Sequence, residues 1–299
     1  MTGVRPVSRP TRRPAQRPAV RSAPRAAPLT RLLRSELRCA LNRPRTLVTF
    51  AVLAFVPLVI AFGVAASGTP SGARSGPGPG LIAAVTANGL MLPVAALAVA
   101  LTLLLPLSAS VAAADALAGE AADGTLRGLL LAPVGRARLV GIKAAGVLAV
   151  VLVGVLLVTA FGAVAGTVVV GGHGRLLTLS GSAVDPANAL ARVGLACGWT
   201  ALQTAAVGAV ALAVSAFTVR PLVVIATVLG GAIVAGVLTA IPSLGWLHPW
   251  LLISDWGALA DLLRDPVPTD SLWHGVLLAV GYLVAGLALA LLGTLRREA

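Results

Sequence analysis

AAGVLAVVLVGVLLVTAFGAVAGTVVVGGHG occupies residues 144–174 and contains no Asp, Glu, Lys or Arg. A helix needs about 20 consecutive, predominantly apolar residues to cross the hydrocarbon core of a bilayer. The run is long enough for that, so it predicts a membrane-spanning helix. Five other runs of at least 25 residues are also free of these four residue types: 46–73, 75–114, 193–219, 221–254 and 271–295.

The composition of the whole chain agrees with a membrane protein. Of its 299 residues, 58% are hydrophobic and only 11% are charged. Soluble globular proteins have about 45–50% apolar and about 25% charged residues. An ordinary soluble enzyme is therefore excluded as the leading interpretation. The expected fold is an all-α, polytopic integral membrane protein with six transmembrane helices.

Clusters of Gly, Pro and Ser mark where the chain leaves its spans. The second span is too long for one bilayer, because about 33 helical residues reach about 50 Å at about 1.5 Å per residue. We expect it to project beyond the membrane or to bend at Pro93 or Pro106. The six trimmed spans are expected at about 46–66, 81–113, 143–169, 187–216, 222–241 and 273–294.

The Lys and Arg residues are distributed unevenly along the chain. With the N-terminus inside, 19 of the 23 lie on the cytoplasmic side, twelve of them before residue 46, and four lie outside. Cytoplasmic flanks of membrane proteins carry such an excess. We therefore expect a multi-pass protein of the cell (plasma) membrane with both termini in the cytoplasm. The net charge of +13 belongs mainly to the N-terminal tail, so we expect no nucleic-acid partner.

Two segments precede the first span. Residues 1–28 are mostly Arg, Pro, Ala and Ser without periodicity, a composition that predicts a disordered cytoplasmic tail. Residues 29–45 place Leu and Ala at helical spacing, with Arg31, Arg34 and Glu36 among the polar residues between them. This pattern predicts a basic amphipathic helix that lies in the cytoplasmic membrane interface. The alternative is a charged flank that only anchors the orientation.

The segment 115–143, DALAGEAADGTLRGLLLAPVGRARLVGIK, carries seven charges in 29 residues between the second and third spans. Its acidic residues come first and its basic residues last. This order suits two short helices, broken at Asp123 and Gly124 and again before Pro133. The second helix has a ridge of leucines beside Arg127, which suits docking into the groove of a partner protein. The alternative is a loop folded back on its own helices.

The order of residues in this loop resembles the signature of permease subunits of the ABC-2 type. That signature is an Asp, then Gly-Glu, Gly-Thr-Leu-Arg, a Leu pair, a Pro, an Arg, and a Lys at the start of the third span. The resemblance implies a permease domain at 46–299 and, by position, a coupling helix at 124–131 with Glu120 and Arg127 as polar anchors. In that family the coupling helix fits a separate ATP-hydrolysing subunit, and two permease subunits pair around a pathway. The candidate site residues among the matches are Asp115, Gly119, Glu120, Gly124, Thr125, Leu126, Arg127, Leu130, Pro133 and Arg136. Ala118, Leu129, Val134 and Lys143 also match the signature.

The chain lacks the P-loop sequence Gly-x-x-x-x-Gly-Lys-Ser/Thr, because its single lysine, Lys143, follows Ile142. We therefore expect no enzyme activity and no cofactor in this chain, with ATP and Mg²⁺ bound by the partner ATPase. The resemblance implies the permease subunit of an ATP-driven exporter. Its charge-poor spans favour a hydrophobic or amphiphilic substrate, such as a drug or natural product. The alternative is a non-transporting scaffold or regulator that docks a cytoplasmic partner through 115–143.

Three smaller features complete the expectations. The segment 242–272 holds or adjoins four of the five tryptophans and is expected at the outer membrane surface. Its Asp and His residues show no recognised ligand spacing, so we expect no metal site. Gly162 and Gly166 form a GxxxG pair that is expected to pack within the chain. Five polar residues inside the spans are expected to bond to neighbouring helices: Ser108, Ser110, Gln203, Thr204 and Ser215.

Overall fold

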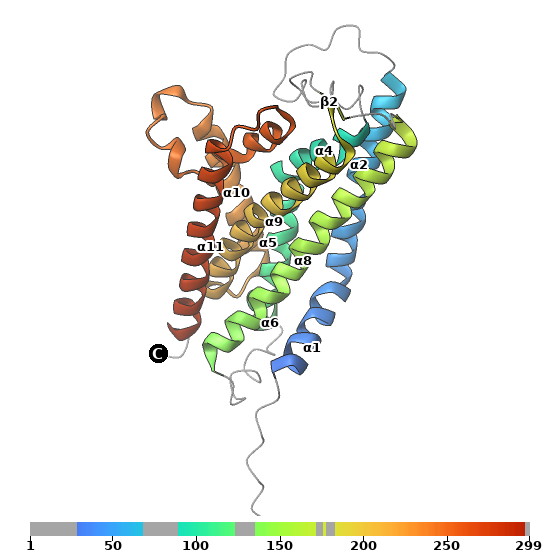
Figure 1. Ribbon diagram of the computed structural model, residues 1–299. Helices are drawn as coiled ribbons and strands as arrows, with labels where there is room; N and C mark the ends of the chain where they lie inside the picture. The colour runs from blue at the N-terminus through green and yellow to red at the C-terminus, as the bar shows by residue number, and fades with distance from the viewer. Residues whose placement is uncertain (1–28, 68–88, 123–134, 172–175, 178–182, 297–299) are drawn as a thin grey trace, which may run out of the picture.

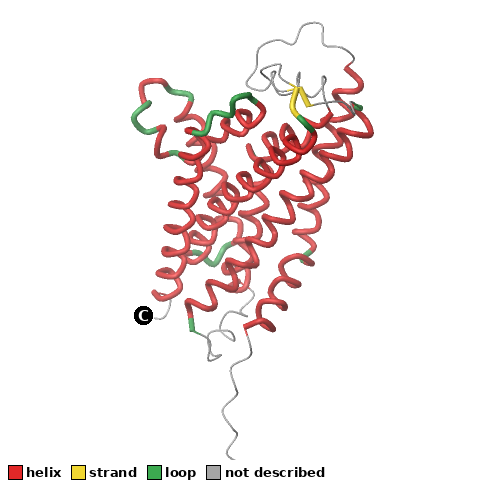
Figure 2. The backbone as a smooth tube through the Cα atoms, in the orientation of Figure 1, coloured by secondary structure: helices red, strands yellow, loops and turns green. Residues whose placement is uncertain are grey.

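The computed structural model describes residues 29–67, 89–122, 135–171, 176–177 and 183–296 (Figures 1 and 2). Five of its helices are long and apolar enough to cross a membrane, and one bent helix pair adds a sixth span if it is counted as one. The predicted all-α membrane fold is confirmed. The five helices are α2 (Pro44–Ser67), α8 (Arg136–Ala165), α9 (Pro186–Phe217), α10 (Pro221–Thr239) and α11 (Asp270–Arg296).

The bent pair corresponds to the long second span. α4 (Leu92–Thr102) and α5 (Leu104–Ala113) meet at Leu103 with a bend of 55°. Pro106 explains the position of the bend, because its ring nitrogen cannot donate to the carbonyl of Thr102 and its ring crowds the preceding turn. Of the expected alternatives, the structure shows a bend near Pro106, with the break three residues before the proline. A short 3₁₀ turn, η1 (Gly89–Met91), precedes α4.

The predicted loop 115–143 is helical at both ends, which corrects the prediction that the second span ends at residue 113. Beyond α5 the helix continues through a π-helical segment, η2 (Ala114–Gly119), and a last turn, α6 (Glu120–Ala122). α8 likewise begins at Arg136 and not at residue 143. The prediction was wrong because it ended each span at its first charge, whereas charges that are paired within the protein continue a helix. The predicted break at Asp123 and Gly124 and the segment before Pro133 lie outside the described residues.

α1 (Leu29–Asn42) forms where the amphipathic helix was predicted and ends immediately before Arg43 and Pro44. Figure 1 shows it leading into α2 beside the first turns of α8, at the same end of the bundle as the C-terminal end of α11. We call this the α1 end. α1 packs mainly against α8 and much less against α2. Glu36 and Ala40 face Gly146 of α8. Glu36 is therefore partly buried and does not share the exposed face of Arg31 and Arg34, although all three are polar residues of the predicted amphipathic pattern.

α9 and α11 form the most extensive helix contact in the described part of the chain. A row of small residues on α11 makes the close approach possible, because the backbones of two helices approach most closely where side chains are small. At Gly286 an added Cβ would lie 2.6 Å from the carbonyl carbon of Ala209. The row consists of Gly275, Ala279, Gly286, Ala290 and Gly293, all buried.

The GxxxG pair, Gly162 near the end of α8 and Gly166 at the start of η3 (Gly166–Val170), packs within the chain, as predicted. An added Cβ at Gly162 would lie 2.9 Å from Cα of Pro93. At Gly166 it would lie 2.0 Å from the carbonyl oxygen of Gly89. α8 continues directly into the π-helical turn η3. Because neither glycine carries a Cβ, the end of α8 and η3 can lie in direct backbone contact with the start of the second span.

The polar residues inside the spans divide into two groups. Gln203 Nε2 donates to the carbonyl oxygen of Gly275 on α11 at 2.9 Å, and Ser215 Oγ accepts from Ala118 N–H at 3.0 Å. These two confirm the predicted contacts between helices. The prediction was wrong for three hydroxyls, which donate to carbonyls three or four residues earlier in their own helices, as Ser and Thr commonly do. These are Ser108, Ser110 and Thr204.

The end opposite α1 is covered by short 3₁₀ helices within the predicted segment 242–272. They are η4 (Pro242–Leu244), η5 (His248–Trp250) and η6 (Leu252–Leu263). Two of the acidic residues here are held by neighbouring side chains: Asp255 accepts from His274 at 2.7 Å, and Asp261 accepts from Ser271 at 3.1 Å. A two-residue antiparallel strand pair, β1 (Leu176–Leu177) and β2 (Ala183–Val184), lies between α8 and α9.

The seam between α9 and α11 leads to a matched pair of glycine substitutions. Gly286→Ala puts a methyl group against the backbone of Ala209, whereas Gly281 on the same helix has no atom within 4 Å of an added Cβ. We expect Gly286→Ala to lower stability by about 1–3 kcal/mol through overpacking, and Gly281→Ala to leave it almost unchanged. Thermal unfolding of the detergent-solubilised protein measures both. Equal melting temperatures for the two variants would contradict the described seam.

Candidate functional site

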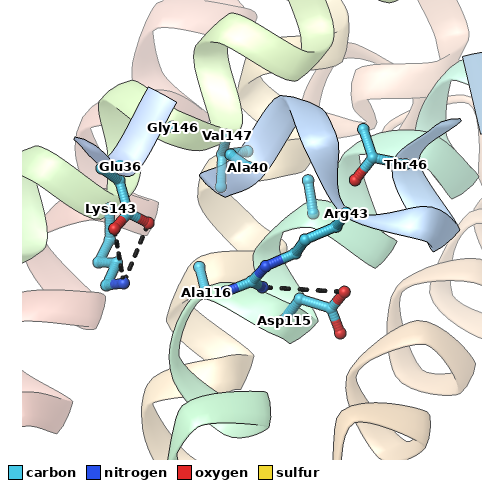
Figure 3. A pocket seen from close by; sticks show the side chains of 10 residues that line it. Glu36, Ala40, Arg43, Thr46, Asp115, Ala116, Lys143, Gly146 and Val147 are labelled. Carbon is cyan, nitrogen blue, oxygen red and sulfur yellow. Dashed lines mark hydrogen bonds and ion pairs between the residues drawn. The ribbon is translucent and has the colours of Figure 1, made fainter. Parts of the chain in front are cut away.

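Six charged side chains of alternating sign form a continuous series at the α1 end, which we call the ion-pair chain. It brings together α1, the junction between α1 and α2, the segments η2 and α6 that end the second span, and the start of α8. Figure 3 shows four of its members around the small pocket that they line. In order, the chain is Glu36, Lys143, Glu120, Arg43, Asp115 and Arg45.

Lys143 is the most deeply buried member, with only 2% of its side chain exposed. Its ammonium group donates to both carboxylate oxygens of Glu36, each at 3.0 Å. It also donates to Oε1 of Glu120. A buried ammonium is costly unless it is paired and hydrogen-bonded. Two carboxylates from different helices supply that pairing here.

Arg43 and Arg45 continue the series from the junction between α1 and α2. The guanidinium of Arg43 lies 3.6 Å from Oε1 of Glu120 and 3.8 Å from Oδ2 of Asp115. Arg45 donates to Oδ1 of Asp115 at 3.1 Å. Burial lowers the pKa of Arg43, whereas the side chain of Cys39 and the two carboxylates raise it. The net pKa lies above its ordinary value, so Arg43 carries a full positive charge.

Local structure places these side chains. Asp115 lies in the π-helical segment η2, whose wider turn is anchored to α9 by the hydrogen bond from Ala118 N–H to Ser215. Segments of π-helix within α-helices occur frequently at functional sites. Glu120 follows in α6, and Lys143 lies about two turns into α8. The two carboxylates thus precede the segment 123–134, and the lysine follows it.

The structure brings only some of the predicted site residues into the ion-pair chain. Asp115 and Glu120 are both in the ion-pair chain. Arg136 donates to the carbonyl oxygen of Thr294 at 3.3 Å, near the end of α11. Gly119 makes only ordinary contacts, because an added Cβ would meet nothing closer than 3.6 Å. The other predicted residues, Gly124, Thr125, Leu126, Arg127, Leu130 and Pro133, lie outside the described residues.

Sequence reasoning did not assign Glu36, Arg43 or Arg45 to the site, and Lys143 entered only as the last residue of the family signature, without a role. Two signals could have pointed to Glu36 and Lys143 as site residues. Glu36 is the only acidic residue before Asp115 and lies among the leucines of an otherwise basic helix. Lys143 is the only lysine of the chain, and it stands directly before an uncharged run of 31 residues. An isolated charge at such a position predicts a buried partner.

The arrangement has the features of a mechanical connection. The pocket that these side chains line has a volume of about 10 Å³, which is room for about one water molecule and not for a substrate. Three cations and three anions balance each other and join segments that lie more than 100 residues apart in the sequence. The ion-pair chain therefore holds the two sides of segment 123–134 together and fastens α1 to both.

A bundle of five to six apolar spans defines a polytopic α-helical membrane protein. A family model described as ABC-2 family transporter protein matches residues 31–297. The chain belongs to this family. No curated protein matches the sequence significantly.

The burial of Lys143 leads to a stability prediction. Lys143→Met leaves two carboxylates facing each other in a largely buried position. We expect a loss of about 3 kcal/mol, the lower end of the range for breaking a buried ion pair, because both carboxylates keep some exposure. Arg45→Met is the matched control, since 68% of the Arg45 side chain is exposed and its loss should cost little. Thermal unfolding in detergent compares them, and a control that is as unstable as Lys143→Met would refute the assignment.

Proposed function

We propose that the chain is the membrane-spanning permease subunit of an ATP-driven exporter. The observation that carries this proposal is the match to the ABC-2 transporter family over almost the whole chain. The apolar spans and the charged segment between the second and third spans support it. In this proposal a separate ATPase subunit binds ATP and Mg²⁺ and hydrolyses the nucleotide, and the chain converts that subunit's motion into alternating access.

The ATPase is proposed to dock on segment 124–131, with Arg127 as a polar anchor. The described residues on both sides support a mechanical role for this segment. Glu120 precedes it, Lys143 follows it, and the two are paired with each other. A push on the segment would therefore reach the second span and α8 together. Glu120 was also proposed as an anchor for the ATPase, but its inward pairing favours a role in holding the loop.

A second permease subunit is proposed to complete the pathway. α10 and α2 are the least covered of the spans. Phe55 and Phe62 on α2, and Ile233 and Val237 on α10, are each more than half exposed. Such surfaces suit contact with lipid or with another subunit.

The proposed substrate is hydrophobic or amphiphilic. An apolar pocket of about 270 Å³ lies between α9, α10, α11 and η6, with Val210, Ala235 and Trp256 among its walls. A second apolar pocket of about 330 Å³ lies between α8, α9 and α11. Walls without charged side chains suit an apolar cargo.

The α1 end is proposed to face the cytoplasm, with the protein in the plasma membrane. The excess of Lys and Arg supports this orientation, because α1, α6, the first turns of α8 and the C-terminal end of α11 lie at one end of the bundle. The cations of the described chain at this end are Arg31, Arg34, Arg38, Arg43, Arg45, Arg136, Arg138, Lys143 and Arg296. α1 is then at the cytoplasmic boundary of the membrane, with its arginines available to lipid headgroups.

The proposal predicts the partner of this chain. Extraction of the tagged protein in mild detergent from its native host should recover a P-loop ATPase at about one copy per permease chain, identified by mass spectrometry. The complex should hydrolyse ATP. Recovery of the intact six-span protein without an ATPase would contradict the exporter and favour a membrane scaffold that docks another cytoplasmic partner through the same loop.

Reversal of one charge tests the docking segment. Arg127→Glu should lower ATP hydrolysis of the complex or prevent its assembly, because the variant places a negative charge at the proposed contact, while membrane insertion is retained. Arg220→Glu is the control, an exposed arginine before α10 that belongs to a different connection. ATPase assays on equal amounts of membrane-inserted protein measure the effect. Full activity of Arg127→Glu would remove this residue from the contact.

A further inference from the structure

The attachment of α1 differs from what its place in the sequence suggests. α1 is followed by α2, yet the helix is broken at Arg43 and α1 packs mainly against α8. Pro44 at the first position of α2 disfavours a continuous helix, because a proline restricts the residue before it. α1 is thus joined to α2 by the backbone and to α8 by side chains.

Two contacts fasten α1 to α8. Gly146 leaves room for the helix, because an added Cβ there would lie 3.3 Å from Cγ of Glu36 and 3.7 Å from Cβ of Ala40. One turn before Gly146, the ammonium of Lys143 holds the carboxylate of Glu36 through two hydrogen bonds. Lys143 is 98% shielded from solvent, so water cannot readily replace a lost partner.

Lys143 also connects this contact to the loop. The same ammonium that holds Glu36 holds Glu120, on the other side of segment 123–134. Arg43 then links Glu120 back to the end of α1. Three ion pairs, Glu36–Lys143, Lys143–Glu120 and Glu120–Arg43, thus connect α1, the first turns of α8, α6 and the end of α1 again. Each of their side chains is at most 25% exposed.

We propose that Glu36 is a positioning residue that, through Lys143, makes α1 part of the unit that receives the motion of the ATPase. α1, α6 and the first turns of α8 then move as one body. This inference rests on the proposed function, since it assumes a partner that acts on segment 123–134. The inference adds α1, which lies outside segment 115–143, to α6 and α8 as a helix that transmits the motion of the ATPase.

The test replaces the ionic contact with a covalent one. Cβ atoms joined by a disulfide lie about 3.5–4.5 Å apart, and the pair Ala40 and Gly146 falls in that range at 3.7 Å. The parent carries Cys39→Ser and Cys197→Ser, which replace both native cysteines. Glu36→Gln is then made in the parent, with and without the pair Ala40→Cys and Gly146→Cys. The matched control is Arg34→Gln, an exposed charge on the same helix.

ATP hydrolysis is measured per intact complex with the co-purified ATPase. Glu36→Gln should reduce it on the order of fivefold, the lower end of typical coupling between sites, while Arg34→Gln should not. Oxidation of the Cys pair should restore hydrolysis to the Glu36→Gln variant, and reduction with dithiothreitol should remove it again. A residue needed only for folding would lower the yield of complex and would not give this reversible rescue.

Several outcomes would overturn the inference. They are full hydrolysis by Glu36→Gln, an equal loss in Arg34→Gln, and a disulfide that forms but restores nothing. Each of these leaves the parent complex active and therefore leaves the proposed function intact. A parent complex without any ATP hydrolysis would instead overturn the proposed function, and this inference with it.

Discussion

The burial of one ammonium group is the constraint on which the α1 end of the protein depends. Lys143 lies where the charged connection meets the apolar third span, and it is almost fully shielded from solvent. Such a charge needs partners within hydrogen-bonding distance, and here both partners come from other helices, Glu36 from α1 and Glu120 from α6. Glu36 therefore draws α1 onto α8, and Glu120 extends the second span by two turns beyond its apolar run. The arginines at the α1–α2 junction then compensate the remaining carboxylates.

The fold could be predicted from the sequence because hydropathy acts over whole segments. α9 and α10 begin and end within about two residues of the expected spans, since Gly, Pro and polar residues mark both ends. The bend near Pro106 followed from the lost backbone donor. The spans beside 115–143 were set too short, because the first charge was taken as the boundary. Asp115 is paired with Arg43 and Arg45, and Arg136 donates to the carbonyl oxygen of Thr294. Because these charges have partners within the protein, the helices include them and do not end at the apolar run.

The site could be predicted only in part, because ion pairs depend on contacts between distant residues. Asp115 and Glu120 were found through their place in a local motif. Glu36 and Lys143 are 107 residues apart, and no local pattern joins them. Glu36 was grouped with the arginines of the polar face because it is charged. Helical spacing also places Glu36 on the same side of α1 as Ala40. Only the packing of α1 on α8 shows that Glu36 belongs to this buried side and not to the arginine side.

The neutrality of the ion-pair chain has a consequence for the surface around it. Its three carboxylates are turned inward, whereas Arg31, Arg34 and Arg38 on α1 remain exposed. The outward charge of α1 is therefore of one sign and attracts mobile anions from solution. Its field is screened within about 8 Å at physiological ionic strength. Salt concentration thus changes how strongly the outer face of α1 attracts anything acidic, while the shielded pairs beneath it are much less affected.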